Sequence, residues 1–108
     1  MSFDIYIEEG LRALRAMKSY MEIAKRVKEM ALRYAPDAKI YVFGSAVEGR
    51  YTAASDIDIL IATNIDREKA YQMKAAIYKE IDAPVQLHVV NTSQIQWYAK
   101  FTNKLIEV

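Results

Sequence analysis

The chain has 108 residues, with 15 lysines and arginines, 14 aspartates and glutamates, one histidine and no cysteine. We expect a single domain over residues 1–108, because domains usually run to about 100–150 residues. The absence of cysteine excludes disulfides, thiolate-held zinc, iron–sulfur clusters and thiol catalysis. No apolar run approaches the roughly 18 residues of a membrane span, and the acidic start does not resemble a secretory signal. We therefore expect a cytoplasmic protein without membrane contact.

Basic residues gather in the first third of the chain. Residues 11–34 contain seven lysines and arginines, but only Glu22 and Glu29 as acids. Such a segment can meet nucleic acid or an acidic partner, or it can be the solvated face of a helix. The solvated face is the commoner situation in folded proteins, so this segment alone does not predict nucleic-acid binding.

Residues 4–34 have the apolar period of a helix. Apolar side chains recur every three or four residues in two neighbouring rows: Ala13, Ala16, Tyr20, Ile23, Val27, Met30 and Tyr34, and Leu14, Met17, Met21, Ala24 and Ala31. A helix of thirty residues would be about 45 Å long, longer than the body of so small a domain. Part of it could meet a second chain, as in a homo-oligomer, or Gly10 could separate the first ten residues as a turn of their own.

Three strands are expected after Pro36, which closes the helical segment. They cover residues 39–43, 56–63 and 84–90, which are rich in β-branched and apolar residues. Pro84 stands at the first position of the last strand, where a missing hydrogen-bond donor is tolerated. Residues 44–55, between the first two strands, are expected to form a loop.

Two further helices complete the predicted order. The first covers residues 66–80 and is capped by Asp66, with an inward row of Ala70, Met73, Ile77 and Ile81. The second begins at Thr92 as its cap and carries Ile95, Tyr98, Phe101, Leu105 and Ile106. The resulting order, α-β-β-α-β-α, indicates a small α/β (α+β) domain.

Asp56 and Asp58 are the residues in this sequence that a purely structural role explains least well. On a strand, residues i and i+2 point to the same face, about 7 Å apart. Two carboxylates on one face of an apolar strand repel each other and resist burial. A divalent cation would remove that cost, and Mg²⁺ is typically held by one or two carboxylates together with substrate phosphates. An isolated Asp-x-Asp is, however, also a common surface feature.

Gly44 and Ser45 supply a context for this acid pair. They follow directly on strand 39–43, and ten residues separate them from Asp56. Glycine permits close approach of the backbone to a phosphate, and a loop of small residues presents N–H groups and a hydroxyl. A phosphate cradle beside a metal-binding acid pair is what phosphoryl or nucleotidyl transfer requires. Neither a P-loop motif nor a dinucleotide-binding glycine motif occurs in the chain.

The pattern of Gly44-Ser45, ten residues and Asp56-x-Asp58 resembles the signature of the DNA polymerase β-like nucleotidyltransferase superfamily. With Phe43 and the preceding helix, the chain is most similar to the minimal nucleotidyltransferases of bacteria and archaea. The resemblance covers most of the chain and implies a small mixed sheet flanked by helices. It also implies that Gly44 and Ser45 hold a nucleoside triphosphate such as ATP, and that Asp56 and Asp58 coordinate Mg²⁺.

Two positions depart from that superfamily's pattern. The superfamily has a third carboxylate on the following strand, where this chain has Gln86 and His88 on one face. Gln86 offers only a neutral amide oxygen, whereas His88 could act as a base or a weak extra ligand, or could simply line the cleft. The second departure is at Glu48-Gly49-Arg50, where relatives often have a basic residue before the glycine and an acid after it. Arg50 is then expected to be the nearest contact for the triphosphate. Glu48 would then either repel the phosphates or pair with Arg50 at the surface.

Aromatic residues are frequent near the end of the chain. Trp97, Tyr98 and Phe101 could stack on nucleic acid bases. Their helical spacing is more typical of side chains in a core or an interface, and we predict that role for them.

The resemblance also implies a biological role. Minimal nucleotidyltransferases resemble antitoxins that pair with a small all-helical HEPN partner, and some transfer AMP from ATP to a tyrosine of that partner. We therefore expect Mg²⁺-dependent transfer of a nucleoside monophosphate to a hydroxyl, with Asp56 and Asp58 catalytic and Arg50 assisting. The alternative is a binding module that has lost its third acid and neutralises its partner by contact. An RNA-acting enzyme is less well supported, because RNA-modifying relatives carry binding domains that 108 residues cannot contain.

Overall fold

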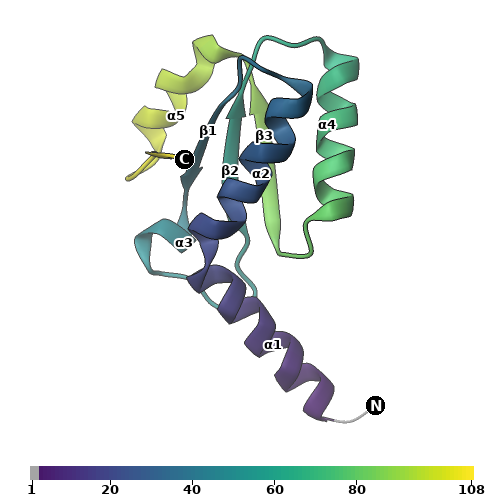
Figure 1. The fold of residues 1–108 in the computed structure, drawn as a ribbon. Coiled ribbons are helices and arrows are strands. Elements are labelled where there is room, and N and C mark those ends of the chain that lie inside the picture. The colour runs from purple at the N-terminus through teal and green to yellow at the C-terminus, as the bar shows by residue number, and fades with distance from the viewer. Residues whose placement is uncertain (1–2) are drawn as a thin grey trace.

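The computed structural model describes residues 3–108 (Figure 1). The elements in chain order are α1 (Phe3–Lys18), α2 (Tyr20–Tyr34), β1 (Lys39–Phe43), α3 (Ser45–Glu48), β2 (Ile57–Ala62), α4 (Arg67–Glu80), β3 (Val85–Val90), the 3₁₀ turn η1 (Thr92–Gln94), α5 (Ile95–Phe101) and β4 (Ile106–Glu107). The expected succession of elements is present, with a break in the first helix, a one-turn helix and a short last strand added. Among the described residues, no helix is both long and apolar enough to cross a membrane.

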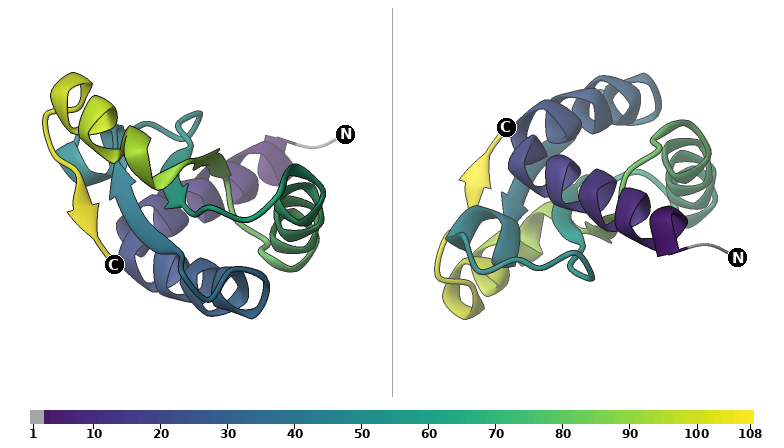
Figure 2. Two further views of the ribbon diagram at one scale, coloured as in Figure 1. Left: turned by 90° about the horizontal axis from the view of Figure 1, so that it is seen from above. Right: turned by 90° about the horizontal axis from the view of Figure 1, so that it is seen from below.

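Four strands form one mixed sheet in the order β3-β2-β1-β4. β1 runs antiparallel to β2 and to β4, whereas β2 and β3 run parallel. The parallel pair needs a long crossover connection, and α4 supplies it. Helices α2 and α4 lie on one face of the sheet and α5 lies on the other (Figures 1 and 2). The expected small mixed sheet flanked by helices is thus confirmed.

The core lies between the sheet and the two helices α2 and α4. In β2, the second strand along the sheet, every residue except Asp58 is buried. The helices contribute fully buried side chains to the same core: Ala24, Val27 and Ala31 from α2, and Met73 and Ile77 from α4. Burial of a large apolar side chain is worth about 1.5–3 kcal/mol. Packing therefore fixes β2, and with it the position of Asp58.

The expected single helix over residues 4–34 is wrong, because the chain breaks at Ser19 and not at Gly10. Ser19 has φ −97° and ψ 24°, whereas Gly10 lies inside α1. α2 is 15 residues long, or about 22 Å. That length matches the roughly 20 Å of a six-residue strand. The break lets α2 follow the sheet while α1 extends beyond it (Figure 1).

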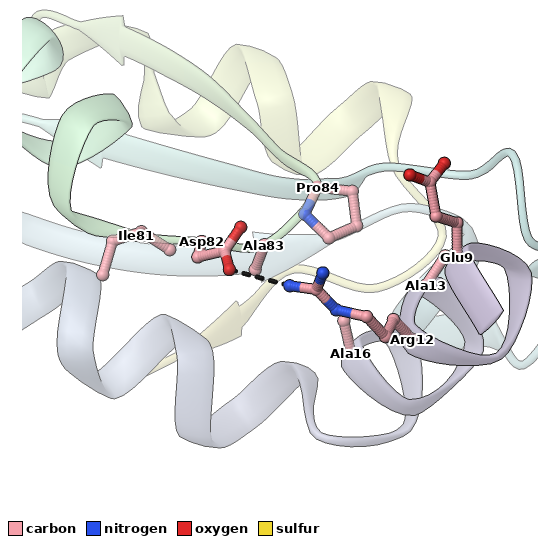
Figure 3. A pocket seen from close by; sticks show the side chains of 8 residues that line it. All are labelled: Glu9, Arg12, Ala13, Ala16, Ile81, Asp82, Ala83 and Pro84. Carbon is pink, nitrogen blue, oxygen red and sulfur yellow. Dashed lines mark hydrogen bonds and ion pairs between the residues drawn. The ribbon is translucent and has the colours of Figure 1, made fainter. Parts of the chain in front are cut away.

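Helix α1 projects from the body and makes few contacts with it. Arg12 donates to the Asp82 carboxylate across 2.8 Å, and Figure 3 shows this pair joining α1 to the turn before β3. Their side chains are 64% and 91% exposed, so the ion pair contributes less than about 1 kcal/mol. Several large apolar residues of α1 are exposed: Ile5, Tyr6, Ile7 and Leu11. Contact of this helix with a second chain stays a prediction.

Of the two N-terminal caps predicted for the later helices, one is confirmed and the other is wrong. Asp66 accepts a hydrogen bond from the Lys69 N–H at 2.8 Å, so the expected cap of α4 is confirmed. Thr92 does not cap the last helix. Asn91 and Gln94 form a reciprocal capping box around η1, and the Thr92 hydroxyl donates to the Asn64 side-chain oxygen at 3.1 Å. An Asn side chain satisfies orphan N–H groups at a helix start better than Thr does.

The last helix is also shorter than expected. α5 ends at Phe101, and Leu105 and Ile106 lie outside it. Ile106 pairs with Val42 of β1 in the short strand β4, and the Val108 N–H donates to the Ile40 carbonyl at 2.8 Å. The free edge of β1 offers backbone hydrogen bonds that a longer α5 would leave unmade.

Asp37 ties the end of β2 to the segment between α2 and β1. The Thr63 hydroxyl donates to Asp37 Oδ1 at 2.6 Å, and the Asn64 N–H donates to Oδ2 at 2.9 Å. These bonds hold the pKa of the Asp37 carboxyl below its usual value, with the Thr63 hydrogen bond as the largest cause. The ionised carboxylate thus stabilises the fold by fixing the chain as it leaves β2.

The lowered pKa of Asp37 predicts an acid-dependent stability. Its contribution is present above the ordinary carboxyl pKa and is lost as the pH falls through the lowered folded-state pKa. Asp37→Ala should therefore lower the urea midpoint at pH 7, and the difference from wild type should shrink in acid. Asp82→Ala, which removes an exposed carboxylate, is the matched control. A deficit that stays constant between pH 7 and pH 2 would contradict this role of Asp37.

Candidate functional site

The turn after β1 is built around Gly44. Its φ of 83° and ψ of −158° belong to a region that is essentially restricted to glycine. Ser45 then begins the single helical turn α3, and the Glu48 N–H donates to the Gly44 carbonyl at 3.1 Å. The expectation of a loop throughout residues 44–55 is therefore wrong for α3, where the small residues close a tight helical turn.

Gly44 lies directly against Asp58. The register of β1 and β2 pairs Phe43 with Asp58, so the next backbone unit passes over the carboxylate. A β-carbon on Gly44 would lie 3.3 Å from Asp58 Cγ and closer still to Oδ2. Only glycine fits this position, because both its conformation and its neighbour exclude a side chain.

The two predicted metal-ligating aspartates occupy different positions relative to β2. Asp58 is the second residue of the strand and is half-buried, whereas Asp56 stands just before the strand and is exposed. Ile57, Ile59 and Ile61 belong to the core on the α2 and α4 side. Strand alternation therefore points Asp58 to the opposite face of the sheet, where α5 lies.

Gln86 and His88 share one face of β3, as the sequence predicted, and the structure places Asp58 on the same face of the sheet. Gln86 is in register with Asp58 on the neighbouring parallel strand, and its side chain is exposed. His88 Nε2 is 3.2 Å from Asp58 Oδ1. A carboxylate only accepts hydrogen bonds, so the ring nitrogen in this contact carries its hydrogen. The structure thus brings His88 into the candidate site, while its role there stays a prediction.

Glu48 and Arg50 form an ion pair, which is the second of the two arrangements considered for them. Arg50 Nη2 lies 3.1 Å from Glu48 Oε1, and the same oxygen accepts from Asn103 Nδ2 at 2.8 Å. The Asn103 hydrogen bond, followed by the Arg50 contact, holds the pKa of Glu48 below its usual range. The Arg50 side chain remains 67% exposed, so its other N–H groups can reach an anion.

Asn103 is the site neighbour that sequence reasoning missed. It lies 55 positions beyond Glu48 and joins the segment after α5 to α3. No local pattern marks such a pair, because an isolated asparagine in a loop carries no spacing signal. The only hint in the sequence is that residues 102–104 are polar and follow a predicted helix.

The donor set of the site fits a cation that is completed by a substrate. Among the described residues, no group of three or more His, Asp or Glu side chains could hold a metal ion. The candidate oxygen donors at this end of β2 are the carboxylates of Asp56 and Asp58, with the neutral amide of Gln86 in register with Asp58. Mg²⁺ is held in this way, by one or two carboxylates with substrate phosphates and water, whereas a structural zinc site needs four protein ligands.

A model of the nucleotidyltransferase domain family matches residues 20–106, and the chain belongs to this family. The match begins at the first residue of α2, so α1 lies outside it. The matched residues include Gly44, Ser45, Asp56 and Asp58.

Two solved structures resemble this fold. One is the crystal structure of a protein provisionally assigned as a nucleotidyltransferase, with 31% sequence identity and a TM-score of 0.66. The match covers 78% of this chain and 95% of that chain. The other, provisionally assigned in the same way, is from Sulfolobus solfataricus. It is 21% identical, with a TM-score of 0.62 and coverage of 89% of this chain and 85% of that chain, and it supports the fold alone. A search of curated protein sequences found no match.

Gly44→Ala tests whether the close approach to Asp58 is essential to the site. The added methyl group should displace the Asp58 carboxylate and destabilise the fold by about 1–3 kcal/mol. Gly49→Ala is the matched control, because Gly49 also has a positive φ, 73°, but open space around its Cα. The Gly49→Ala variant should lose only about 1–2 kcal/mol of stability, because its alanine must adopt a left-handed backbone conformation. NMR shifts of the Asp58 carboxyl should change in the first variant only, and equal shifts in both would contradict the contact.

Proposed function

We propose that this protein is a Mg²⁺-dependent nucleotidyltransferase that moves a nucleoside monophosphate, AMP from ATP, to a hydroxyl group. The observation that carries the proposal is the packing of the Gly44 backbone against the Asp58 carboxylate. This contact brings a turn suited to phosphates and an acid suited to a cation together in one place. Membership of the nucleotidyltransferase family supports the same reaction class.

The side chains have distinct roles in this reaction. Asp56 and Asp58 hold the cation, while the backbone and hydroxyl of Gly44 and Ser45 bind the triphosphate. Mg²⁺, when bound, neutralises the developing negative charge on the phosphates. Arg50 adds a positive charge at the exposed side of its pair with Glu48. The acceptor oxygen forms a bond to the α-phosphorus, and the bond to the departing pyrophosphate breaks.

The proton of the acceptor hydroxyl needs a base, and His88 is the residue we propose. Gln86, at the place of the superfamily's third carboxylate, has an amide that does not accept a proton at neutral pH. His88 Nε2 lies 3.2 Å from Asp58 Oδ1. In the tautomer whose Nε2–H donates to the carboxylate, Nδ1 is the basic nitrogen. An imidazole nitrogen with a free lone pair can accept a proton as a general base.

We propose a tyrosine of a HEPN-type partner as the acceptor, so that the protein acts as an antitoxin. This step rests on the resemblance to minimal nucleotidyltransferases.

The second candidate function is a binding module of the same fold that neutralises its partner without catalysis. The observation that favours it is Gln86, which is in register with Asp58 where an acid would complete the metal site. A neutral amide weakens cation binding, because the site then depends on two carboxylates alone.

Removal of the paired carboxylates tests the donor site. The Asp56→Asn/Asp58→Asn variant should bind ATP more than tenfold more weakly than wild type when Mg²⁺ is present, as measured by calorimetry. The weakening should disappear when EDTA removes the metal, because the carboxylates act through the cation. Asp82→Asn, which changes an exposed aspartate away from the site, should bind like wild type. If the double variant retained wild-type Mg²⁺-dependent affinity, these aspartates would not be the metal ligands.

Restoring the missing acid separates the two candidate functions. The enzyme proposal expects the wild type to add one AMP to the HEPN-type partner, seen as a mass increase of the partner, and Gln86→Glu to accelerate the reaction. Gln86→Ala controls for loss of the amide. A binding module instead gives an inert wild type and an active Gln86→Glu variant, and that pair of results would overturn the enzyme proposal.

A further inference from the structure

Trp97 and Phe101 form an open aromatic surface on α5. Their side chains are 57% and 70% exposed, and their ring centroids are 4.5 Å apart. None of the residues of α5, all of which the structure describes, is buried. Trp97 and Phe101 therefore do not lie in the core, and the other role predicted for them, in an interface, stays a prediction. Figure 2 shows α5 on the face opposite α2 and α4, where no other helix covers it.

A continuous row of rings connects this pair with the candidate metal site. The ring of Trp97 lies 5.2 Å from that of Tyr98, and Tyr98 lies 5.9 Å from Phe43 and 6.1 Å from His88. His88 in turn contacts the Asp58 carboxylate at 3.2 Å. Trp97 is thus connected to the Asp58 carboxylate through the rings of Tyr98 and His88.

The segment after α5 lies near the turn formed by Gly44 and Ser45. Asn103, two residues beyond Phe101, donates to Glu48 of α3 at 2.8 Å, and α3 begins directly after Gly44. Two contacts therefore link α5 and the segment after it to the candidate site. Tyr98 lies against His88, and Asn103 bonds to Glu48 of α3.

The charge around the pair favours an anionic ligand. Residues 83–105 contain no aspartate or glutamate, but they include Lys100 and Lys104. Lys104 and Arg50 both help to lower the pKa of Glu48, so two cations lie near this single carboxylate at the end of α3. Exposed aromatic side chains together with nearby lysines or arginines are typical of surfaces that bind nucleotides.

We propose that Trp97 and Phe101 stack on the base of the donor nucleotide whose phosphates lie at Gly44 and Asp58. This inference rests on the proposed function, since it concerns the same donor site. Stacking acts on the ring face and not on the hydrogen-bonding edge, so it tolerates any base. Donor selection at this surface then follows ring size, with ATP and GTP bound alike and CTP and UTP bound more weakly.

Trp97 is the only tryptophan of the chain, so its emission reports on this surface alone. With Mg²⁺ present, ATP should quench the Trp97 fluorescence of the wild-type protein. Inorganic tripolyphosphate should bind, as measured by calorimetry, without the same quenching, because it carries the phosphates but no base. Equal quenching by the two ligands would contradict stacking.

Calorimetry on variants measures the contribution of the rings. Phe101→Ala should weaken ATP binding by about fivefold to a hundredfold and leave tripolyphosphate binding unchanged. Phe101→Tyr, which keeps the ring, should restore ATP affinity and thereby excludes a merely structural effect. The matched control is Tyr71→Ala, which removes a ring that is 64% exposed on α4, at the other face of the sheet.

The possible failures are distinguishable. If ATP binds the wild type with Mg²⁺ and Phe101→Ala binds it equally well, the stacking proposal is wrong while the donor site stands. Loss of both ATP and tripolyphosphate binding in Phe101→Ala also overturns it, because the ring would then support the fold and not the base. If neither ligand binds the wild type, the proposed function fails and the stacking proposal fails with it.

Discussion

The burial of β2 is the constraint on which the candidate site depends. Five of its six residues are buried, so the strand cannot shift along its neighbours without exposing apolar side chains. Asp58 is therefore held on the α5 face of the sheet, although a carboxylate resists burial. The Gly44 backbone closes over it from β1, and His88 contacts it from β3. A hydrophobic core thus positions the polar contact between Asp58 and His88.

The site is assembled from segments that are distant in the sequence. The turn after β1 supplies Gly44, β2 supplies Asp58 and the residue before it is Asp56. β3 supplies His88, and the segment after α5 supplies Asn103. The hydrogen bond from Asn103 to Glu48 links the last of these to α3, and β4 secures the chain end against β1. The C-terminal segment therefore supports the candidate site through Asn103 and extends the sheet at the edge of β1.

The replacement of the third acid gives this site a different chemistry from the pattern that it resembles. With Gln86 at this position, the proposed cation would have two carboxylate ligands, and substrate phosphates would have to complete its coordination. The ring of His88 lies between Asp58 and the aromatic row of α5. One side chain thus connects the proposed cation site, the proposed proton acceptor and the proposed base-stacking surface.

The sequence by itself determined those features that depend on local pattern. The apolar runs marked β1, β2 and β3, the Asp66 cap marked the start of α4, and the spacing of Gly44-Ser45 to Asp56-x-Asp58 indicated the family. The break at Ser19, the pairing of β4 with β1, the Glu48–Asn103 bond and the exposure of Trp97 came only from the tertiary structure. Each depends on the length of the sheet, its free edge, or contacts between residues far apart in the chain, and these quantities leave no periodic signal in a single sequence.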